Sequence, residues 1–425
     1  MSMKKIFISW IFVSILFVQC GAVSSLDDLL SRREVKEVRV LGTQSGFNKI
    51  LEVMIEQPLD HRDPDGATFL QKIYISHADP SKPVVFITEG YDARYYHTSE
   101  ITAELQCNQI MVEHRYFGKS RPDNPYWHFL NTWQAASDHH RIVTLFKEVY
   151  TGKWIATGIS KGGQTVMYHS FYYPDDVDVR VPYVAPLNFE VEDQRIYDFL
   201  DHVSSARDRR RIKKFQIMAL KYQDRYLPAF REFSEKKHYT YELAGGIEKA
   251  YEYCVLEYSF AFWQWGTVPV KKIPGRTANP MEVIRHMNQV AGFGYFDDGH
   301  IVEKQPFFYQ ALTEMGYYGY DLDEFEPYLQ HVENPIFSFT MPEEVEIPFN
   351  RELSRQLEDY LTSEADNFIY IYGEYDTWSA TAVTSTGHTN SKIFIKARGS
   401  HRTRINNLPE SQKQEVYNTL YRFLQ

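Results

Sequence analysis

Cysteine is scarce in this sequence. Three cysteines occur in 425 residues: Cys20 closes an N-terminal apolar run, and Cys107 and Cys254 lie further along the chain. So few cysteines cannot crosslink a protein of this size at several points, and its stability must come from a hydrophobic core even in an oxidising compartment. Their spacing fits no metal-binding pattern, and we predict neither a metal ion nor a cofactor.

Positive charge is also in deficit. The chain has 46 lysines and arginines against 56 acidic residues, and its net charge is −10. Nucleic-acid-binding proteins usually carry the opposite excess, so we expect no nucleic acid partner. The hydrophobic fraction of 43% and the aromatic fraction of 16% instead indicate a folded protein with a large core.

Long hydrophobic runs are limited to the N-terminus. Residues 6–18 form an apolar stretch that is shorter than the ~20 residues needed to span a bilayer. Two lysines precede this stretch and small residues follow it, which is typical of a signal peptide over residues 1–22. Cleavage of that segment and lipidation of Cys20 both fit the pattern. We therefore expect an exported protein, which is periplasmic, extracellular or attached to the cell surface through Cys20.

The first part of the chain alternates between strand-like and helical segments. Residues 48–77 contain two apolar runs on either side of an Asp/Pro/Gly turn, which is typical of an antiparallel pair. Further short apolar runs follow at 84–88, 109–112, 154–156 and 179–187, and a helical pattern lies at 133–149. This alternation predicts a parallel sheet with helices on both faces.

The character of the chain changes after residue 187. Long charged and aromatic helical segments follow, and strand signals return only at 367–373 and 391–397, before a closing helix. We therefore predict an α/β core built from residues 23–187 and 351–425. A large, mainly helical cap, residues 188–350, interrupts this core.

The stretch "TGISKGG" places Ser160 between Gly158 and Gly162, directly after an apolar run. The pattern Gly-x-Ser-x-Gly between a strand and a helix exposes a serine hydroxyl above a parallel sheet, and the small residues leave room for the sharp turn. A helical segment at 163–173 completes the pattern. It is typical of the α/β-hydrolase fold, so Ser160 is the predicted nucleophile.

A serine hydroxyl needs a base to remove its proton, and the base needs a carboxylate to fix its tautomer. In this fold the order along the chain is Ser, acid, His. Asp376 follows the next-to-last predicted strand and His401 follows the last one, so we predict them as acid and base. Glu374 is an alternative acid. His388 precedes the last strand and should lie at the opposite edge of the sheet.

The oxyanion of an acyl-transfer reaction needs backbone N–H donors. One donor is expected from Lys161, the residue after the nucleophile. The other is expected from the loop after the strand at 84–88, where Gly90 lets the backbone approach closely. We predict the N–H of Gly90 or of Tyr91 as this second donor.

Six stretches, in this order along the chain, resemble a single family: "QPLDHRDPDGATFLQKIYI", "ITEGY", "EHRYFGKSRP", "GISKGG", "YGEYDTWS" and "GSHR". They are similar to the secreted bacterial tripeptidyl aminopeptidases, serine peptidases related to the lysosomal Pro-X carboxypeptidases. The resemblance implies Ser160 as nucleophile, Asp376 as acid and His401 as base. It also implies release of tripeptides from free N-termini, often with proline before the cleaved bond. One position departs from the family, since Thr377 stands where proline commonly follows the acid.

An enzyme that recognises a free N-terminus needs carboxylates for the substrate ammonium. Two groups of acidic residues are candidates, each of which could equally be an ordinary surface acid or an ion-paired one. They are Glu190, Glu192 and Asp193, where the chain enters the predicted cap, and Glu89 and Glu113, which end two strands near Ser160.

Other functions stay open at this point. An esterase or lipase would use the same triad with an apolar acyl channel, a Pro-X carboxypeptidase-like peptidase would act at the other terminus, and an inactive hydrolase fold would serve as a surface binding protein. The sequence leaves the oligomeric state undetermined.

Overall fold

A computed structural model describes residues 25–123, 126–343, 345 and 347–425. The predicted signal peptide and Cys20 lie outside the described residues. In these residues nine strands form one sheet, in the order β1-β2-β3-β5-β4-β6-β7-β8-β9. The strands are β1 (Val35–Gln44), β2 (Phe47–Pro58), β3 (Thr68–His77), β4 (Val84–Thr88), β5 (Asn108–Val112), β6 (Trp154–Ile159), β7 (Val179–Tyr183), β8 (Ile369–Gly373) and β9 (Lys392–Lys396).

The sheet is antiparallel at one edge and parallel elsewhere. β1, β2, β3 and β5 pair antiparallel in turn, whereas the pairs from β5 through β4 to β9 are parallel. The predicted antiparallel pair is confirmed as β2 and β3, and the predicted parallel strands are confirmed as β4 to β9. β7 is shorter than the run at 179–187 that predicted it.

Strand β1 has no counterpart in the sequence analysis. It pairs with β2 alone and is largely exposed. An edge strand with both faces partly in water carries charged residues among its valines, so the alternation that marks a strand is weak.

Helices cover both faces of the sheet. The core of one face joins residues of α3 (Thr132–Lys147), α4 (Lys161–Tyr172) and α11 (Arg351–Ser363). The other face is covered by α2 (Glu100–Leu105) and α12 (Glu410–Phe423). Val84 and Phe86 of β4 belong to the first core, and Val85 and Ile87 to the second. Successive side chains of a strand point to opposite faces, so a short apolar run serves both layers.

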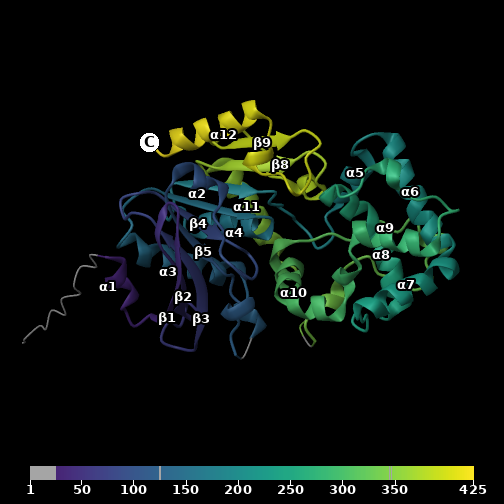
Figure 1. Cartoon of the computed structure of the whole chain (residues 1–425), viewed down its shortest axis with the longest axis horizontal. Coiled ribbons are helices and arrows are strands. Elements are labelled where there is room, and N and C mark those ends of the chain that lie inside the picture. The colour runs from purple at the N-terminus through teal and green to yellow at the C-terminus, as the bar shows by residue number, and fades with distance from the viewer. Residues whose placement is uncertain (1–24, 124–125, 344, 346) are drawn as a thin grey trace, which may run out of the picture.

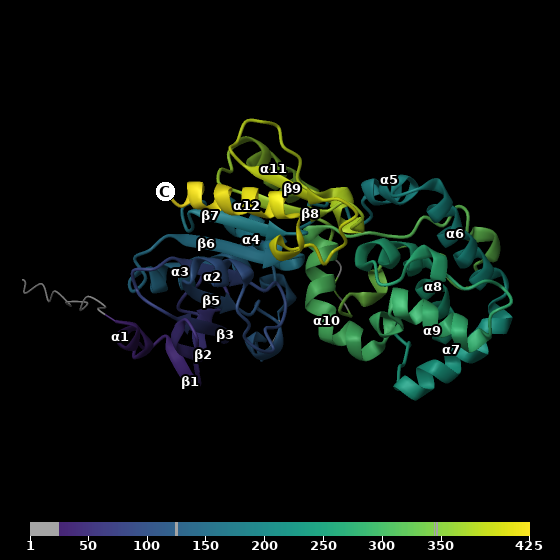
Figure 2. The same ribbon diagram turned by 45° about the horizontal axis from the view of Figure 1, so that its top comes forward.

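Figures 1 and 2 show a helical cap beside the sheet, entered after β7 and left before α11. The yellow C-terminal strands β8 and β9 lie next to the much earlier β7. A short helix, α1 (Leu26–Leu30), precedes the sheet, and the cap contains α5 (Gln194–His202), α6 (Ala206–Lys221), α7 (Gln223–Lys237), α8 (Ile247–Trp265), α9 (Pro280–Ala291) and α10 (Asp298–Gln310).

The cap has a core of its own, centred on α8. Most residues of this aromatic helix are buried, and they pack with the other cap helices in one cluster. Trp378, from the loop after β8, joins that cluster, and its ring centroid lies 5.2 Å from that of Phe260 in α8. The loop that carries Asp376 is therefore packed directly against the cap. Among the described residues, no helix combines the length and apolar character that crossing a membrane requires.

Candidate active site

Ser160 lies on the sharp turn between β6 and α4. Its φ is +56° and its ψ is −121°, a backbone conformation that is costly for a residue other than glycine. The turn is held on both sides, because the Ser160 N–H donates to the carbonyl of Tyr183 at 2.8 Å and its carbonyl accepts from the Gln164 N–H at 2.9 Å. The Ser160 hydroxyl caps no helix N–H, and Ser160 lines a cavity between the sheet and the cap.

Gly162 gives this turn its room. A Cβ atom at this position would lie 2.3 Å from the carbonyl oxygen of Thr88 in β4. The first turn of α4 therefore lies closer to the neighbouring strand than any side chain would permit. The second glycine of the Gly-x-Ser-x-Gly pattern thus has a steric role.

His401 and Asp376 form a buried pair. The Nδ1 of His401 lies 2.7 Å from the Oδ2 of Asp376, and the two residues are 5% and 0% exposed. With a carboxylate at Nδ1, that nitrogen carries the proton and donates it, which leaves Nε2 with a free lone pair. The His401 backbone N–H donates to the carbonyl of Gln264 at the end of α8, at 2.7 Å, so the cap helps to fix the histidine loop.

The other candidate acid, Glu374, and the other histidine considered, His388, lie away from Ser160. Glu374 is exposed and accepts a hydrogen bond from the backbone N–H of Arg398 at 2.6 Å. His388 is exposed, in the segment that precedes β9. Neither residue lines the cavity that contains Ser160 and His401. Asp376, not Glu374, is the carboxylate in contact with His401.

The predicted oxyanion donors lie against one another. Lys161 is the first residue of α4, so its N–H has no partner within the helix. Gly90 has a φ of +73°, and a Cβ there would lie 2.5 Å from the Gly162 nitrogen. Glycine is therefore required for the loop after β4 to touch the first turn of α4. In the described part of the chain, no backbone hydrogen bond engages the N–H of Lys161 or Tyr91.

The Lys161 side chain stabilises the contact between the Gly90 loop and α4. The sequence analysis did not predict this role. Its Nζ donates to the carbonyl of Gly90 at 2.6 Å and lies over the rings of Tyr91 and Phe117, 5.7 and 5.3 Å from their centroids. Burial lowers the pKa of Lys161 well below its ordinary value. Burial also raises the pKa of the Tyr91 phenol, while a hydrogen bond with Ser160 lowers it in part. Both side chains therefore belong to the surroundings of Ser160.

A cavity of about 980 Å³ lies between the sheet and the cap. Its volume suits a peptide of several residues. The core contributes Glu89, Tyr91, Ser160, His401, Arg402 and Arg404 to its wall, and the cap contributes Glu257, Phe260, Trp265, Tyr295, Phe307 and Tyr318.

Of the five predicted amine-binding acids, Glu89 is the one placed at this cavity. Burial, with the nearby carboxylates of Asp92 and Glu113, raises the pKa of Glu89 to about 7. Glu113 is instead committed to structure: it forms an ion pair with Lys72 at 2.7 Å, and its oxygens also accept from the Ser120 hydroxyl and from backbone N–H groups.

The three acids at the cap entrance have partners of their own. Glu190 pairs with Arg351 at 3.1 Å, and Glu192 accepts a hydrogen bond from the Tyr197 hydroxyl. Asp193 caps α5 and pairs with Arg195, at 2.7 Å. None of the three lines the cavity that contains Ser160.

Glu257 in α8 is a cavity residue that the sequence analysis did not identify. It is 4% exposed, and its Oε2 accepts hydrogen bonds from the hydroxyls of Tyr318 and Tyr320, both at 2.8 Å. Burial raises the pKa of Glu257 to about 8. The available signal was an acid in the aromatic run "YEYCVLEYSFAFWQWG", where an unpaired charge is expensive to bury.

The parallel strands, the serine turn after β6 and the cap inserted after β7 place the chain among the serine hydrolases of the α/β-hydrolase fold. Within that class, the family described as PS-10 peptidase S37 matches residues 22–421, and the chain belongs to this family of serine peptidases. The resemblance found in the sequence motifs is thereby confirmed, and a peptide substrate follows from the family.

Individual proteins are similar to this chain over different shares of its length. A prolyl tri/tetrapeptidyl aminopeptidase of Streptomyces mobaraensis is 30% identical over 336 residues, which cover 78% of this chain and 70% of that protein. A prolyl carboxy peptidase like protein 5 of Caenorhabditis elegans is 26% identical over 147 residues, 30% of this chain and 29% of that protein. A solved structure of proline iminopeptidase from Mycobacterium smegmatis covers 87% of this chain and 98% of its own, with a TM-score of 0.45 and 14% identity.

Proposed function

We propose that this protein is an exported exopeptidase that removes tripeptides from the free N-termini of peptides. The observation that carries the proposal is a buried carboxylate, Glu257, in the wall of the same cavity as Ser160 and His401. The name of the Streptomyces relative, a prolyl tri/tetrapeptidyl aminopeptidase, supports the same activity.

Cleavage proceeds through an acyl-enzyme. His401 Nε2 takes the proton of Ser160 as its oxygen attacks the carbonyl carbon of the third peptide bond, and Asp376 stabilises the imidazolium that forms. The N–H groups of Lys161 and of Gly90 or Tyr91 hold the oxyanion. His401 then gives its proton to the leaving nitrogen. Water, activated by the same histidine, releases the tripeptide from Ser160.

The substrate ammonium is held by Glu257, whose raised pKa falls when the ammonium binds, because a neighbouring positive charge favours the ionised carboxylate. A carboxylate in an aromatic wall has little water to compete for it, and an ammonium is the group that satisfies its charge. Three residues of extended chain reach about 10 Å, so a fixed acid in the cap limits how much peptide fits between it and Ser160. Glu89, at the sheet side of the cavity, is the second candidate for this contact.

A proline side chain before the cleaved bond suits the aromatic part of the wall. Phe260, Tyr318 and Trp378 all line the cavity, and the rings of Phe260 and Tyr318 are stacked with centroids 3.8 Å apart. Rigid aromatic faces favour a compact, apolar ring, and a proline residue within a peptide has no backbone N–H to satisfy. A proline preference therefore forms part of the proposal.

The deciding experiment compares three substrates. A free-amine Ala-Ala-Pro amide with a fluorogenic leaving group should be cleaved with a kcat/KM about 30-fold or more above that of its N-acetylated form, because acetylation removes a charge-assisted contact. A short-chain ester tests the esterase alternative. Equal rates on free and acetylated peptides would refute the aminopeptidase, and a preference for the ester alone would favour the esterase.

Export is part of the same proposal, and it rests on the apolar run at residues 6–18 and the lysines before it. Fractionation of cells that express the full chain should place the protein outside the cytoplasm. Labelling with a radioactive fatty acid separates the two forms: label that is lost in Cys20→Ala indicates a lipid anchor, and an unlabelled, shortened protein indicates cleavage. Retention in the cytoplasm at full length would contradict export.

A further inference from the structure

The side of the cavity that receives the leaving group can be located from His401. This residue donates its proton to the leaving nitrogen, so the part of the peptide after the cleaved bond must lie at the histidine side of Ser160. The Trp265 ring lies edge-on to the His401 ring, with centroids 5.5 Å apart. Trp265 therefore marks the wall against which the departing peptide lies.

Arg402 stands at this wall. Its guanidinium lies over the Trp265 ring, 5.9 Å from the centroid, and its side chain lines the cavity. In the described part of the chain, no ion pair engages this guanidinium. Arg402 is exposed, and the N–H donors of a guanidinium match the two oxygens of a carboxylate.

The other charged groups at this side are already engaged. Arg404 donates to the carbonyls of His401 and Thr403, at 3.0 and 2.7 Å. Glu100 accepts from the backbone N–H groups of residues 405 and 406, at 2.8 and 2.9 Å. Arg402 is thus the cavity arginine with an uncommitted head at the leaving-group side. The acids Glu89 and Glu257 line the same cavity, so it presents groups of both signs.

We infer that Arg402 forms a subsite for the C-terminal carboxylate of a short peptide, one or two residues beyond the cleaved bond. Two residues reach about 7 Å past that bond, and the arginine side chain covers a similar length. A net charge of −10 repels peptide carboxylates from the surface as a whole, whereas a cavity arginine without an ion pair attracts one. This inference rests on the proposed function and narrows its substrates to short oligopeptides.

The test compares Ala-Ala-Pro-Ala with a free carboxylate and with a C-terminal carboxamide. The wild-type kcat/KM should be about three- to tenfold higher for the free acid, as expected for a partly solvated guanidinium–carboxylate pair. Added salt should reduce this ratio. In Arg402→Gln the ratio should fall to about one, and in Arg402→Lys it should be intermediate, because the charge remains and the planar head is lost.

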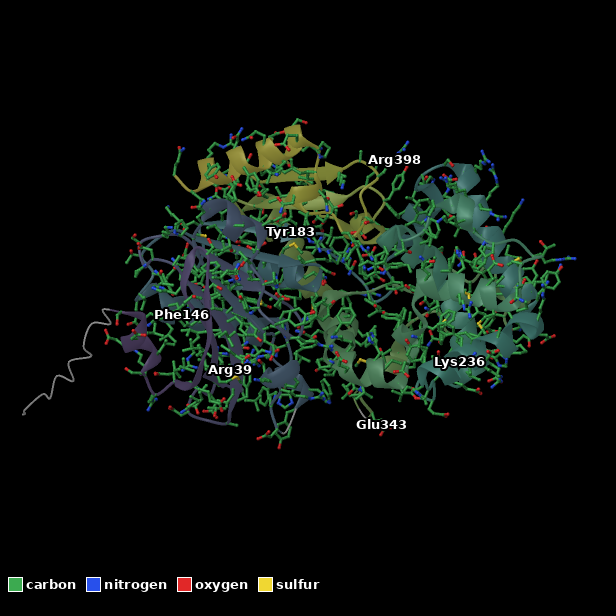
Figure 3. All side chains as sticks on the ribbon, in the orientation of Figure 1. Arg39, Phe146, Tyr183, Lys236, Glu343 and Arg398 are labelled. Atoms are coloured by element: carbon green, nitrogen blue, oxygen red, sulfur yellow. The ribbon has the colours of Figure 1, made fainter. Side chains whose placement is uncertain are left out.

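Arg39→Gln is the matched control. It removes one positive charge from the edge strand β1, at the opposite edge of the sheet from β9, and Arg39 lies well apart from Arg398 of the loop before Arg402 (Figure 3). This variant should keep the wild-type ratio. No discrimination in the wild type, or an unchanged ratio in Arg402→Gln, would overturn the inference. Ala-Ala-Pro with a fluorogenic leaving group lacks any carboxylate, so failure to cleave this substrate marks failure of the proposed function itself. The free-acid peptide could also be cleaved equally well with and without an N-acetyl group. That result would keep the Arg402 subsite but would identify the enzyme as a carboxypeptidase rather than an aminopeptidase.

Discussion

The imidazole of His401 and the carboxylate of Asp376 meet at 2.7 Å, across loops that follow neighbouring strands. Asp376 also accepts from the Trp378 N–H at 3.2 Å, so the carboxylate is held by its own loop while it orients the histidine. The His401 N–H is bound to the cap at Gln264. The pair is therefore fixed both by the sheet edge and by the cap, as a base of defined tautomer requires.

Removing the nucleophile or the base should have nearly the same effect. Ser160→Ala and His401→Ala should each lower kcat on the fluorogenic tripeptide by about four to six orders of magnitude, and the double variant should be no worse than either, because the two residues act as a unit. Circular dichroism should show an intact fold. Activity retained in both single variants, or additive losses, would contradict the triad.

The acid can be tested against its neighbour in the same loop. Asp376→Asn should lower kcat by about 10⁴, because the amide favours the wrong histidine tautomer. Glu374→Gln is the matched control, since this exposed residue binds a backbone N–H of Arg398, and it should change kcat less than about twofold. If Glu374→Gln proves the more damaging variant, the assigned acid is wrong.

The sequence predicted the parts of the site that depend on chain order. Ser160, Asp376 and His401 each follow a strand, and parallel strands bring the loops at their carboxyl ends to one edge. The pattern around Ser160 and the position of Gly90 reflect backbone geometry that only glycine permits. Such features can be recognised from adjacent residues alone.

The acids that border the cavity were harder to predict because they depend on how the cap packs. Glu190 and Asp193 were chosen for their place at the cap entrance, yet Arg351 and Arg195 neutralise them. Glu257 lies within the aromatic helix α8 and was not predicted. Long-range contacts determine which face of α8 borders the cavity, so the local sequence does not reveal it. Three-dimensional packing, which no local pattern encodes, decides which acid borders the cavity.

The close approach of Gly90 to α4 predicts a sensitive position. Gly90→Ala would place a Cβ 2.5 Å from the Gly162 nitrogen at a φ of +73°. The loop must then move away from Lys161, and loss of one oxyanion donor should lower kcat by about 10²- to 10³-fold with little change in KM. Gly387→Ala is the control, because its φ is +79° but no atom lies within 4 Å of the added Cβ. Equal losses in both variants would assign the effect to backbone strain rather than to the oxyanion donors.

Selection of the free N-terminus should depend on Glu257. In Glu257→Gln the ratio of kcat/KM between the free and acetylated tripeptide substrates should fall by about tenfold or more, because the amide cannot supply a charge to the ammonium. Glu190→Gln, which alters an exposed acid paired with Arg351, should keep the wild-type ratio. A ratio that survives Glu257→Gln and collapses in Glu89→Gln would move the anchor to the sheet side of the cavity.

Glu257 should also make stability depend on pH. Burial raises its pKa from 4.5 to about 8, so between these values the folded protein holds a proton that the unfolded chain has released. Stability contributed by the neutral carboxyl is therefore present at low pH and declines as the pH rises towards 8. Glutamine is neutral throughout and lacks this dependence.

The Tm of Glu257→Gln relative to wild type should consequently increase between pH 5 and pH 9, by about 2 °C or more. Glu89, whose pKa is about 7, titrates in the same window but is present in both proteins, so its contribution cancels in the difference. Glu190→Gln, at a half-exposed side chain outside the cavity, is the control and should keep a constant Tm difference from wild type. A Tm difference between Glu257→Gln and wild type that stays constant from pH 5 to pH 9, measured by differential scanning calorimetry, would show that the Glu257 carboxyl is already ionised at pH 5 and that its burial does not raise its pKa.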